Sequence, residues 1–318
     1  METTIVDIIE EDILELGKPV LENLLKDRTT RKNIIWSTND YLSLGYSYDA
    51  KYCITIEQIT GSYSNVIQPR VAKAREHQTN RTRDKAEVFT PSWICNEQNN
   101  LIDEQWFGRK NVFNLTENKS WISTTDKIHF DENSKKTWKT YVDANRLEIS
   151  CGEAPYLVSR YDTVTGNTIP INERIGLLDR KLRIVNENTS TEKEWIKWAT
   201  RAIQSIYGFE YQGDNLLLAR ENILYTFIDN MEYKLGRKPT LDELKSISLI
   251  ISWNIWQMDG ISFTVPFGVI EERYKQLTFD IFSDEEPIQA ELQICKIKDW
   301  RSNVSTTYKS LVEGKTNE

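Results

Sequence analysis

Apolar residues recur along this chain with a helical spacing at its beginning and in short runs further on. Near the start they fall mostly three or four positions apart, and the pattern resumes after Pro19: Ile5, Ile8, Ile9, Ile13, Leu14, Leu16, Leu21, Leu24 and Leu25. From Ala86 short apolar runs alternate with helical patterns, which is typical of an α/β domain. We therefore expect a mostly helical N-terminal accessory region over residues 1–85 and an α/β domain over residues 86–318.

Three apolar segments of the second region have the length and composition of buried strands. They are Arg146–Ile149, Ile206–Glu210 and Ile250–Trp256, the last of which we expect to end near Asp259. A helical pattern separates each strand from the next. This order predicts a parallel sheet.

Sequence signals also indicate where several helices begin and where polar loops or insertions lie. Thr191 with Glu194 and Thr240 with Glu243 have the spacing of capping boxes, so each pair should begin a helix. Another helix is expected through Leu216–Phe227. Two polar segments are expected to leave the domain, the first as a loop or small hairpin and the second as an insertion: Asn114–Lys136 and Asp162–Thr191.

A carboxylate lies at or just beyond the end of each predicted strand. Glu148 precedes the turn Cys151–Pro155, Glu210 ends the second strand, and Asp259 follows the third. In open α/β sheets ligands bind at the carboxyl ends of strands, where one acid can accept both hydroxyls of a ribose and another can accept an exocyclic amine. Each acid taken alone is better explained as a residue of a surface loop. The ordered set of three predicts a nucleoside-binding edge.

These segments resemble the adenine-N6 DNA methyltransferases of restriction–modification systems, particularly their modification subunits. The resemblance runs from about Gln68 to Asp259, and its motifs are Ala86–Pro91, Leu147–Leu157, Ile206–Glu210 followed by Ala219–Leu224, and Asn254–Asp259. It implies a Rossmann-like sheet that binds S-adenosyl-L-methionine. It also implies a set of cofactor-binding residues: Phe89, Thr90, Glu148, Cys151, Gly152, Glu210 and Asp259.

The chain departs from the family pattern in the first motif and most clearly in the catalytic turn. Ile149 replaces a proline, Ala154 replaces a glycine, and Glu153 adds an anion that must take the amino group of the cofactor if it is not to oppose binding. The family's Asn/Asp-Pro-Pro-aromatic turn is represented only by Thr264–Phe267. The resemblance therefore implies Thr264, Pro266 and Phe267 as a degenerate catalytic set, in which Phe267 would stack on a flipped base. An ordinary proline-containing loop is the alternative.

The distribution of charge indicates which partners the protein could bind. The net charge is −8, yet Gln68–Lys85 is basic and could contact DNA phosphates, although a solvated helix or linker explains it as well. Roughly fifty residues follow Phe267, fewer than a separate recognition domain needs, so specificity is expected from residues 1–85 or from a specificity or restriction subunit.

The remaining features favour a cytoplasmic protein with no membrane association. The N-terminus is acidic rather than basic, no apolar run approaches the ~20 residues of a membrane span, and the four cysteines form no CxxC pair. His77 and His129 have no neighbours at metal-ligand spacing, so no metal site is expected.

Three functions stay open on the sequence. The first is adenine-N6 methylation of DNA, which requires the degenerate turn to work. The second is a catalytically inactive, methyltransferase-like protein that binds a ligand or partner and regulates a restriction or phage-related system. The third is methyl transfer to another nucleic acid or to a small molecule.

Overall fold

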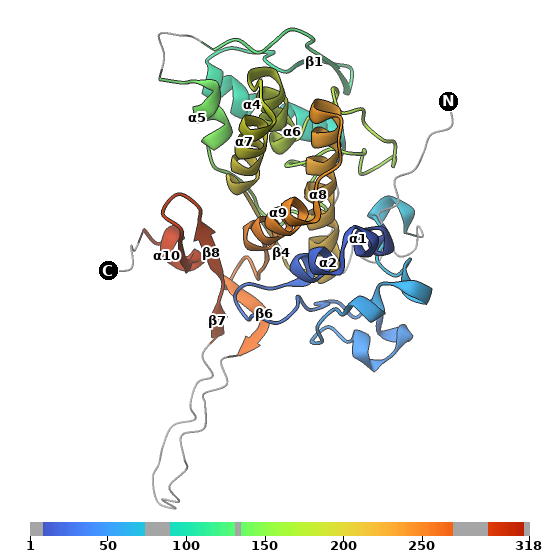
Figure 1. Ribbon diagram of the computed structural model, residues 1–318. Helices are drawn as coiled ribbons and strands as arrows, with labels where there is room; N and C mark the ends of the chain where they lie inside the picture. The colour runs from blue at the N-terminus through green and yellow to red at the C-terminus, as the bar shows by residue number, and fades with distance from the viewer. Residues whose placement is uncertain (1–8, 74–89, 131–134, 270–291, 315–318) are drawn as a thin grey trace, which may run out of the picture.

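The computed structural model describes residues 9–73, 90–130, 135–269 and 292–314, and within them the chain is a mixed α/β structure. Figure 1 shows the elements. The α-helices are α1 (Glu10–Leu16), α2 (Lys18–Leu25), α4 (Ser92–Phe107), α5 (Trp138–Asp143), α6 (Leu177–Asn188), α7 (Glu192–Gln204), α8 (Gly213–Leu235), α9 (Leu241–Asn254) and α10 (Tyr308–Val312). The strands are β1 (Asn114–Glu117), β2 (Ser120–Ser123), β3 (Arg146–Glu148), β4 (Ile206–Glu210), β5 (Ile255–Gln257), β6 (Thr264–Val269), β7 (Leu292–Ile294), β8 (Lys296–Asp299) and β9 (Val304–Thr307).

The centre of the fold is a three-stranded parallel sheet whose strands lie in chain order, β3-β4-β5. Glu148 is opposite Gly208, and Glu210 is opposite Gln257, so the carboxyl ends of the strands meet at one edge. The parallel sheet and its first two strands are confirmed. The expected strand Ile250–Trp256 was wrong in extent, because α9 continues to Asn254 and only Ile255–Gln257 forms β5.

The two faces of this sheet are covered by different parts of the chain. Ile206 and Ile255 belong to the main hydrophobic core, which the helices cover, and Figure 1 shows α7, α8 and α9 gathered beside the sheet. Phe209 and Trp256 alternate with them and pack against Tyr308 of α10 on the other face. Strands β4 and β5 are therefore buried on both faces, as parallel strands usually are.

Helix pairs form both crossovers of the sheet, α6 with α7 and α8 with α9. Thr191 caps α7 by accepting a hydrogen bond from the N–H of Glu194, and Thr240 with Glu243 forms the predicted capping box of α9. The predicted insertion Asp162–Thr191 needs correction, since its second half is α6. Charged residues mask this helix in the sequence, but Arg180 and Lys181 are fully buried beside its apolar face.

The N-terminal residues share the main core with the rest of the chain. Ile13 and Leu24 are fully buried in it, and α2 packs on α9 through the amide of Asn23, which donates to the Ser248 hydroxyl at 3.1 Å. Helices α1 and α2 match the expected helical beginning; Ile5 and Ile8 lie outside the described residues. From Leu42 to Ala72 five single-turn 3₁₀-helices follow instead of longer helices: Leu42–Leu44, Tyr46–Tyr48, Ile56–Gln58, Gly61–Tyr63 and Arg70–Ala72.

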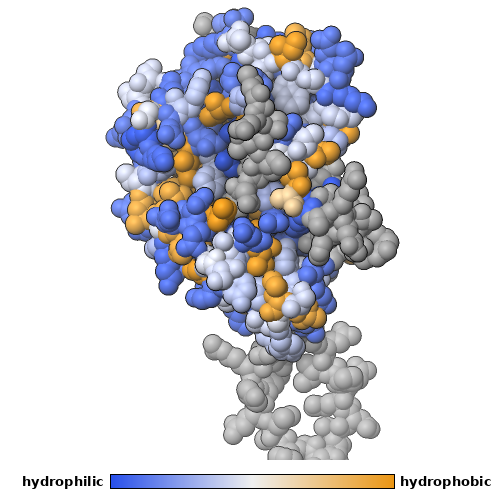
Figure 2. Space-filling view, turned by 90° about the vertical axis from the view of Figure 1, so that its right-hand side faces the viewer, coloured by the Kyte–Doolittle hydropathy of each residue, from blue (hydrophilic) through white to orange (hydrophobic). Residues whose placement is uncertain are grey.

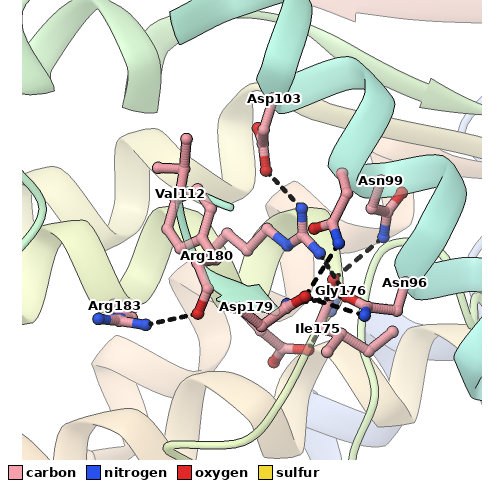
Figure 3. A network of polar contacts seen from close by, with 12 residues as sticks. Asn96, Asn99, Asp103, Val112, Ile175, Gly176, Asp179, Arg180 and Arg183 are labelled. Atoms are coloured by element: carbon pink, nitrogen blue, oxygen red, sulfur yellow. Dashed lines mark hydrogen bonds and ion pairs between the residues drawn. The ribbon is translucent and has the colours of Figure 1, made fainter. Parts of the chain in front are cut away.

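Helix α4 turns a polar face inward. Figure 3 shows Arg180 of α6 reaching this face, where its guanidinium donates to Asp103 at 2.5 Å and to Asn96 at 2.7 Å. The Tyr141 hydroxyl donates to the other Asp103 oxygen at 2.7 Å. All four side chains are at least 98% buried, so these contacts offset the loss of hydration. They hold α4 and α5 to the crossover helix α6.

The hairpin β1–β2 lies within Asn114–Lys136, where a loop or small hairpin was expected. On the face that Figure 2 shows, hydrophobic residues occur in small groups among hydrophilic ones. Within the described ranges, no helix is both long enough and apolar enough to cross a bilayer.

Candidate functional site

The turn after β3 wraps around the end of β4. Ser150, Gly152 and Ala154 all have left-handed backbone conformations, with φ values of 49°, 53° and 64°. Between them, the N–H of Cys151 donates to the Phe209 carbonyl at 2.9 Å. Ala154 occupies a left-handed position that favours glycine.

Glu210 joins this turn to the beginning of α8. One carboxylate oxygen accepts the N–H of Gly152 at 2.8 Å, and the other accepts those of Tyr211 at 2.9 Å and Gln212 at 3.1 Å. The residue is 7% exposed, and burial raises its pKa against the effect of the three donors. A carboxylate has about four acceptor positions, so roughly one remains for a further donor.

Glu148 has a comparable position at the end of β3. Its oxygens accept the N–H groups of Tyr156 at 3.3 Å and Leu157 at 3.2 Å, which fixes the chain beyond the turn. Burial raises the pKa of Glu148 to about 8; the two donors lower it and the nearby Glu210 raises it, each by a smaller amount.

Cys151 is 1% exposed and packs beneath the turn. A Cβ on Gly208 would lie 3.3 Å from its sulfur, which is a tight contact. Burial raises the pKa of the Cys151 thiol well above its usual value, and Glu148 and Glu210 add to the increase. The side chain is therefore a neutral packing group, not an activated nucleophile.

Glu153 is buried and bound within the protein. One oxygen accepts the hydroxyl of Tyr161 at 2.5 Å and the other accepts the backbone N–H of Arg70 at 2.7 Å. The amide of Asn222 donates both to the Glu153 carbonyl and to the Tyr161 hydroxyl. The expected anion thus has internal donors, and it fastens the turn to α8.

The described part of the basic segment also faces an acid. Lys73, with a side chain 10% exposed, forms an ion pair of 3.1 Å with the fully buried Asp214 in the first turn of α8. The hydroxyl of Tyr41 donates to the same carboxylate oxygen at 2.7 Å. Lys73 therefore forms an ion pair within the protein. Residues 74–85 of the basic segment Gln68–Lys85 lie outside the described residues.

Gln257 is a site residue that the sequence reasoning missed. Its side-chain amide accepts the N–H of Ile35 at 2.9 Å and donates to the Ile35 carbonyl at 2.8 Å, so it binds the N-terminal segment as a strand would. The same segment covers the start of α8, where a Cβ on Gly213 would lie 2.0 Å from the Ile35 carbonyl oxygen. A glycine shortly after Glu210 was the available signal of this close approach.

Asp259 lies beyond β5 and closes its own turn. One oxygen accepts the N–H groups of Ile261 at 2.8 Å and Ser262 at 3.3 Å. The N–H of Met258, next to it, donates to the Glu210 carbonyl at 3.0 Å, which holds this turn against the end of β4. Asp259 is half-buried, and no described residue donates to its second oxygen.

The three residues of the expected catalytic turn lie in strand β6 instead of a turn. The Thr264 carbonyl accepts the N–H of Asp259 at 2.8 Å, its hydroxyl bonds to that of Ser262, and Pro266 is buried. Phe267 is 51% exposed, and its ring centroid lies 6.4 Å from that of Tyr211. The proline-containing strand thus brings one aromatic ring to the residue that follows Glu210.

Two expected cofactor-binding residues belong to the motif Ala86–Pro91. Phe89 lies outside the described residues, and Thr90 lies within them. The Thr90 carbonyl accepts the Thr163 hydroxyl at 3.0 Å and the Cys95 thiol at 3.6 Å. The structure thus brings Thr90, Glu148, Cys151, Gly152 and Glu210 together, with Asp259 beside them.

The acceptor groups at this edge suit a polar ligand with several hydroxyl or amine donors. Carboxylates with spare acceptor positions end neighbouring strands, and Tyr211 with Phe267 supplies aromatic surface. Comparisons with known proteins gave no matching family model, no matching curated protein and no matching solved structure.

Proposed function

We propose that this protein is a methyltransferase-like protein that binds S-adenosylmethionine and acts on adenine N6 in DNA. The observation that supports this most is the hydrogen bond from the Gly152 N–H to Glu210. It joins the first and second of the motifs that resemble the family, as a shared ligand site at a sheet edge requires.

The residues present fit such a cofactor by their chemistry. In the proposal, the spare acceptor position of Glu210 takes a ribose hydroxyl and the free oxygen of Asp259 takes the adenine amine. When bound, S-adenosylmethionine would supply an activated methyl group on a sulfonium. The half-exposed ring of Phe267 would stack on the acceptor base and hold its amine in place.

A catalytically inactive, ligand-binding protein is the second candidate, and the position of Thr264 favours it. Its carbonyl and hydroxyl both have partners within the β5–β6 connection, and it supplies no amide or carboxylate to orient an amine. On this alternative, the edge binds the cofactor but no methyl group is transferred.

Calorimetric titration with S-adenosylmethionine tests the shared part of both candidates. We expect binding by the full chain and at least about tenfold weaker binding by Asp259→Asn, since one buried hydrogen bond to a charged group is worth about 1.5–3 kcal/mol. Asp126→Asn, an exposed aspartate outside this edge, is the matched control. Equal affinity of the full chain and Asp259→Asn would remove Asp259 from the site, and no binding by the full chain would contradict both candidates.

A methyl-transfer assay on duplex DNA distinguishes the active methyltransferase from the inactive, cofactor-binding protein. Incorporation into DNA that falls in Phe267→Ala, with cofactor affinity unchanged, supports the enzyme. Cofactor binding without incorporation into DNA supports the inactive protein. Incorporation into RNA or a small acceptor alone would replace DNA as the substrate.

A further inference from the structure

A segment of the N-terminal region lies across the carboxyl edge of the parallel sheet. It comprises residues 33–41, which we call the strap. The Ile35 N–H donates to the side-chain oxygen of Gln257 at 2.9 Å, and the Trp36 carbonyl accepts the N–H of Gly213 at 3.0 Å. Gln257 ends β5 and Gly213 begins α8. The strap therefore contacts two elements of the edge at which ligands bind in open α/β sheets.

The side chain of Gln257 joins the strap to the candidate site. Its nitrogen donates toward three acceptors: the Ile35 carbonyl at 2.8 Å, the Tyr211 carbonyl at 2.9 Å and the Ser37 hydroxyl at 3.1 Å. An amide has two hydrogens, so none remains for a ligand. Gln257 can therefore act on the site only through its neighbours, and one of them, Tyr211, directly follows Glu210.

The turn between β4 and α8 is held from two directions. On one side, the Glu210 carboxylate accepts two N–H groups of the turn. On the other, the Tyr211 carbonyl accepts from Gln257, and the Gly213 N–H donates to the strap. Strap and turn are in close contact, since a Cβ on Gly213 would overlap the Ile35 carbonyl oxygen. Detachment of the strap would therefore leave the turn held on one side only.

Aromatic packing anchors the strap beside this turn. Trp36 is fully buried, and its ring centroid lies 4.8 Å from that of Tyr41 and 5.3 Å from that of Tyr48. The Tyr41 hydroxyl donates to the buried Asp214 at the beginning of α8. These contacts place the strap where Gln257 can bind it.

We propose that Gln257 is a positioning residue for the ligand of the carboxyl edge. It fixes the strap and Tyr211 relative to each other, so that docking of the strap and binding of the ligand favour one another. The inference rests on the proposed binding of S-adenosylmethionine at Glu210 and Asp259. The coupling is reciprocal: loss of the strap's contacts weakens the ligand, and the ligand stabilises the docked strap by the same factor, for which about tenfold is ordinary.

Two variants loosen the strap from opposite sides. Gln257→Met nearly keeps the length of the side chain and removes its hydrogen bonds, and Gly213→Ala places a methyl group against the Ile35 carbonyl. In calorimetric titration with S-adenosylmethionine, each should bind about tenfold more weakly than the wild type. Asn230→Leu is the matched control, since this amide of α8 is 3% exposed against 1% for Gln257 and bonds to Asn186 instead of the strap. It should bind as the wild type does.

Hydrogen exchange of the wild type supplies the reciprocal measurement. The Ile35 amide reports docking of the strap, because its N–H donates to Gln257. Saturating S-adenosylmethionine should slow its exchange about tenfold. The amide of Thr189, which bonds to Val185 at the end of α6, should not change.

The outcomes distinguish this inference from the proposed function. Equal affinity of the wild type and both strap variants would overturn the inference and leave the ligand site in place. So would exchange of the Ile35 amide that bound ligand does not slow. Equal weakening in Asn230→Leu would assign the effect to general destabilisation and would also overturn it. No binding by the wild type would contradict the proposed function, and the inference with it.

Discussion

The carboxylate of Glu210 accepts the backbone N–H of Gly152 at 2.8 Å, and so the end of the second parallel strand holds the turn that follows the first. Because Glu210 also accepts two N–H groups at the start of α8, one side chain fixes two turns relative to each other. The shape of the carboxyl edge therefore depends on this residue with or without a ligand.

Replacement of Glu210 should lower the free energy of unfolding. Glu210→Ala leaves three N–H groups without their acceptor, those of Gly152 and Tyr211 part-buried and that of Gln212 buried, and we expect a loss of about 3 kcal/mol in the free energy of unfolding. Glu210→Gln should lose less, because its amide oxygen still accepts. Urea denaturation measures both, with the exposed Glu97→Ala as control. Equal losses in the alanine and glutamine variants would contradict this role.

Glu148 should make stability depend on pH. Its pKa is about 8 in the folded protein against 4.5 for the free side chain, so between these values the folded state holds a proton that the unfolded state has lost. The free energy of unfolding should therefore fall as pH rises through this window, by a few kcal/mol at 1.36 kcal/mol per pKa unit. The change should level off above pH 8.

Glu148→Gln isolates this contribution, since other buried carboxyls such as Glu221 titrate in both proteins. Denaturant unfolding at both ends of the window should show the wild type losing stability relative to the variant as pH rises. A constant difference would show that Glu148 ionises normally in the folded protein.

The contact between Tyr41 and Asp214 should couple the N-terminal segment to α8. Tyr41→Phe removes a 2.7 Å hydrogen bond to a fully buried carboxylate, which is worth about 1.5–3 kcal/mol. A double-mutant cycle with Asp214→Asn should give a coupling energy, whereas Tyr46→Phe, at a 74% exposed position, should have little effect. Additive losses in the cycle would mean that the two residues act independently.

The ion pair between Asp103 and Arg180 should be sensitive to removal of either partner. Asp103→Ala leaves a buried guanidinium charge and should cost about 3–5 kcal/mol. The double variant Asp103→Leu with Arg180→Met should lose less than the sum of the two single changes. Thermal unfolding compares them with Asp242→Ala, whose exposed partner is Lys245 and whose loss should stay below about 1 kcal/mol.

Local signals in the sequence predicted the parts of the fold that local chemistry determines. The N-cap at Thr191, the capping box at Thr240 and the short strand Ile206–Glu210 carry their own signals, in hydrogen-bonding side chains and in buried apolar residues. The α6 and α9 boundaries were missed because tertiary contacts decide them. Buried Arg180 and Lys181 make α6 read as polar, and α9 reads as a strand because its last turns are apolar.

The candidate site was predictable only where its residues follow from local sequence signals. The positions of Glu148 and Glu210 followed from strand ends, and the structure brings them together. Gln257 was not predictable, because its partner Ile35 lies 222 residues away in the chain. Nothing in the local sequence shows that an N-terminal segment crosses this edge.

The packing of α2 on α9 has a consequence for how the protein is made. Asn23 bonds to Ser248, 225 positions later in the chain, so α2 leaves the ribosome long before its partner. At synthesis rates of about 5–20 residues per second, this wait is roughly 10 to 45 seconds. During that time the part of α2 that packs on α9 has no native partner, although α1 already contacts this helix. We therefore expect this part of α2 to stay exposed in the growing chain until the polypeptide through α9 has been synthesised.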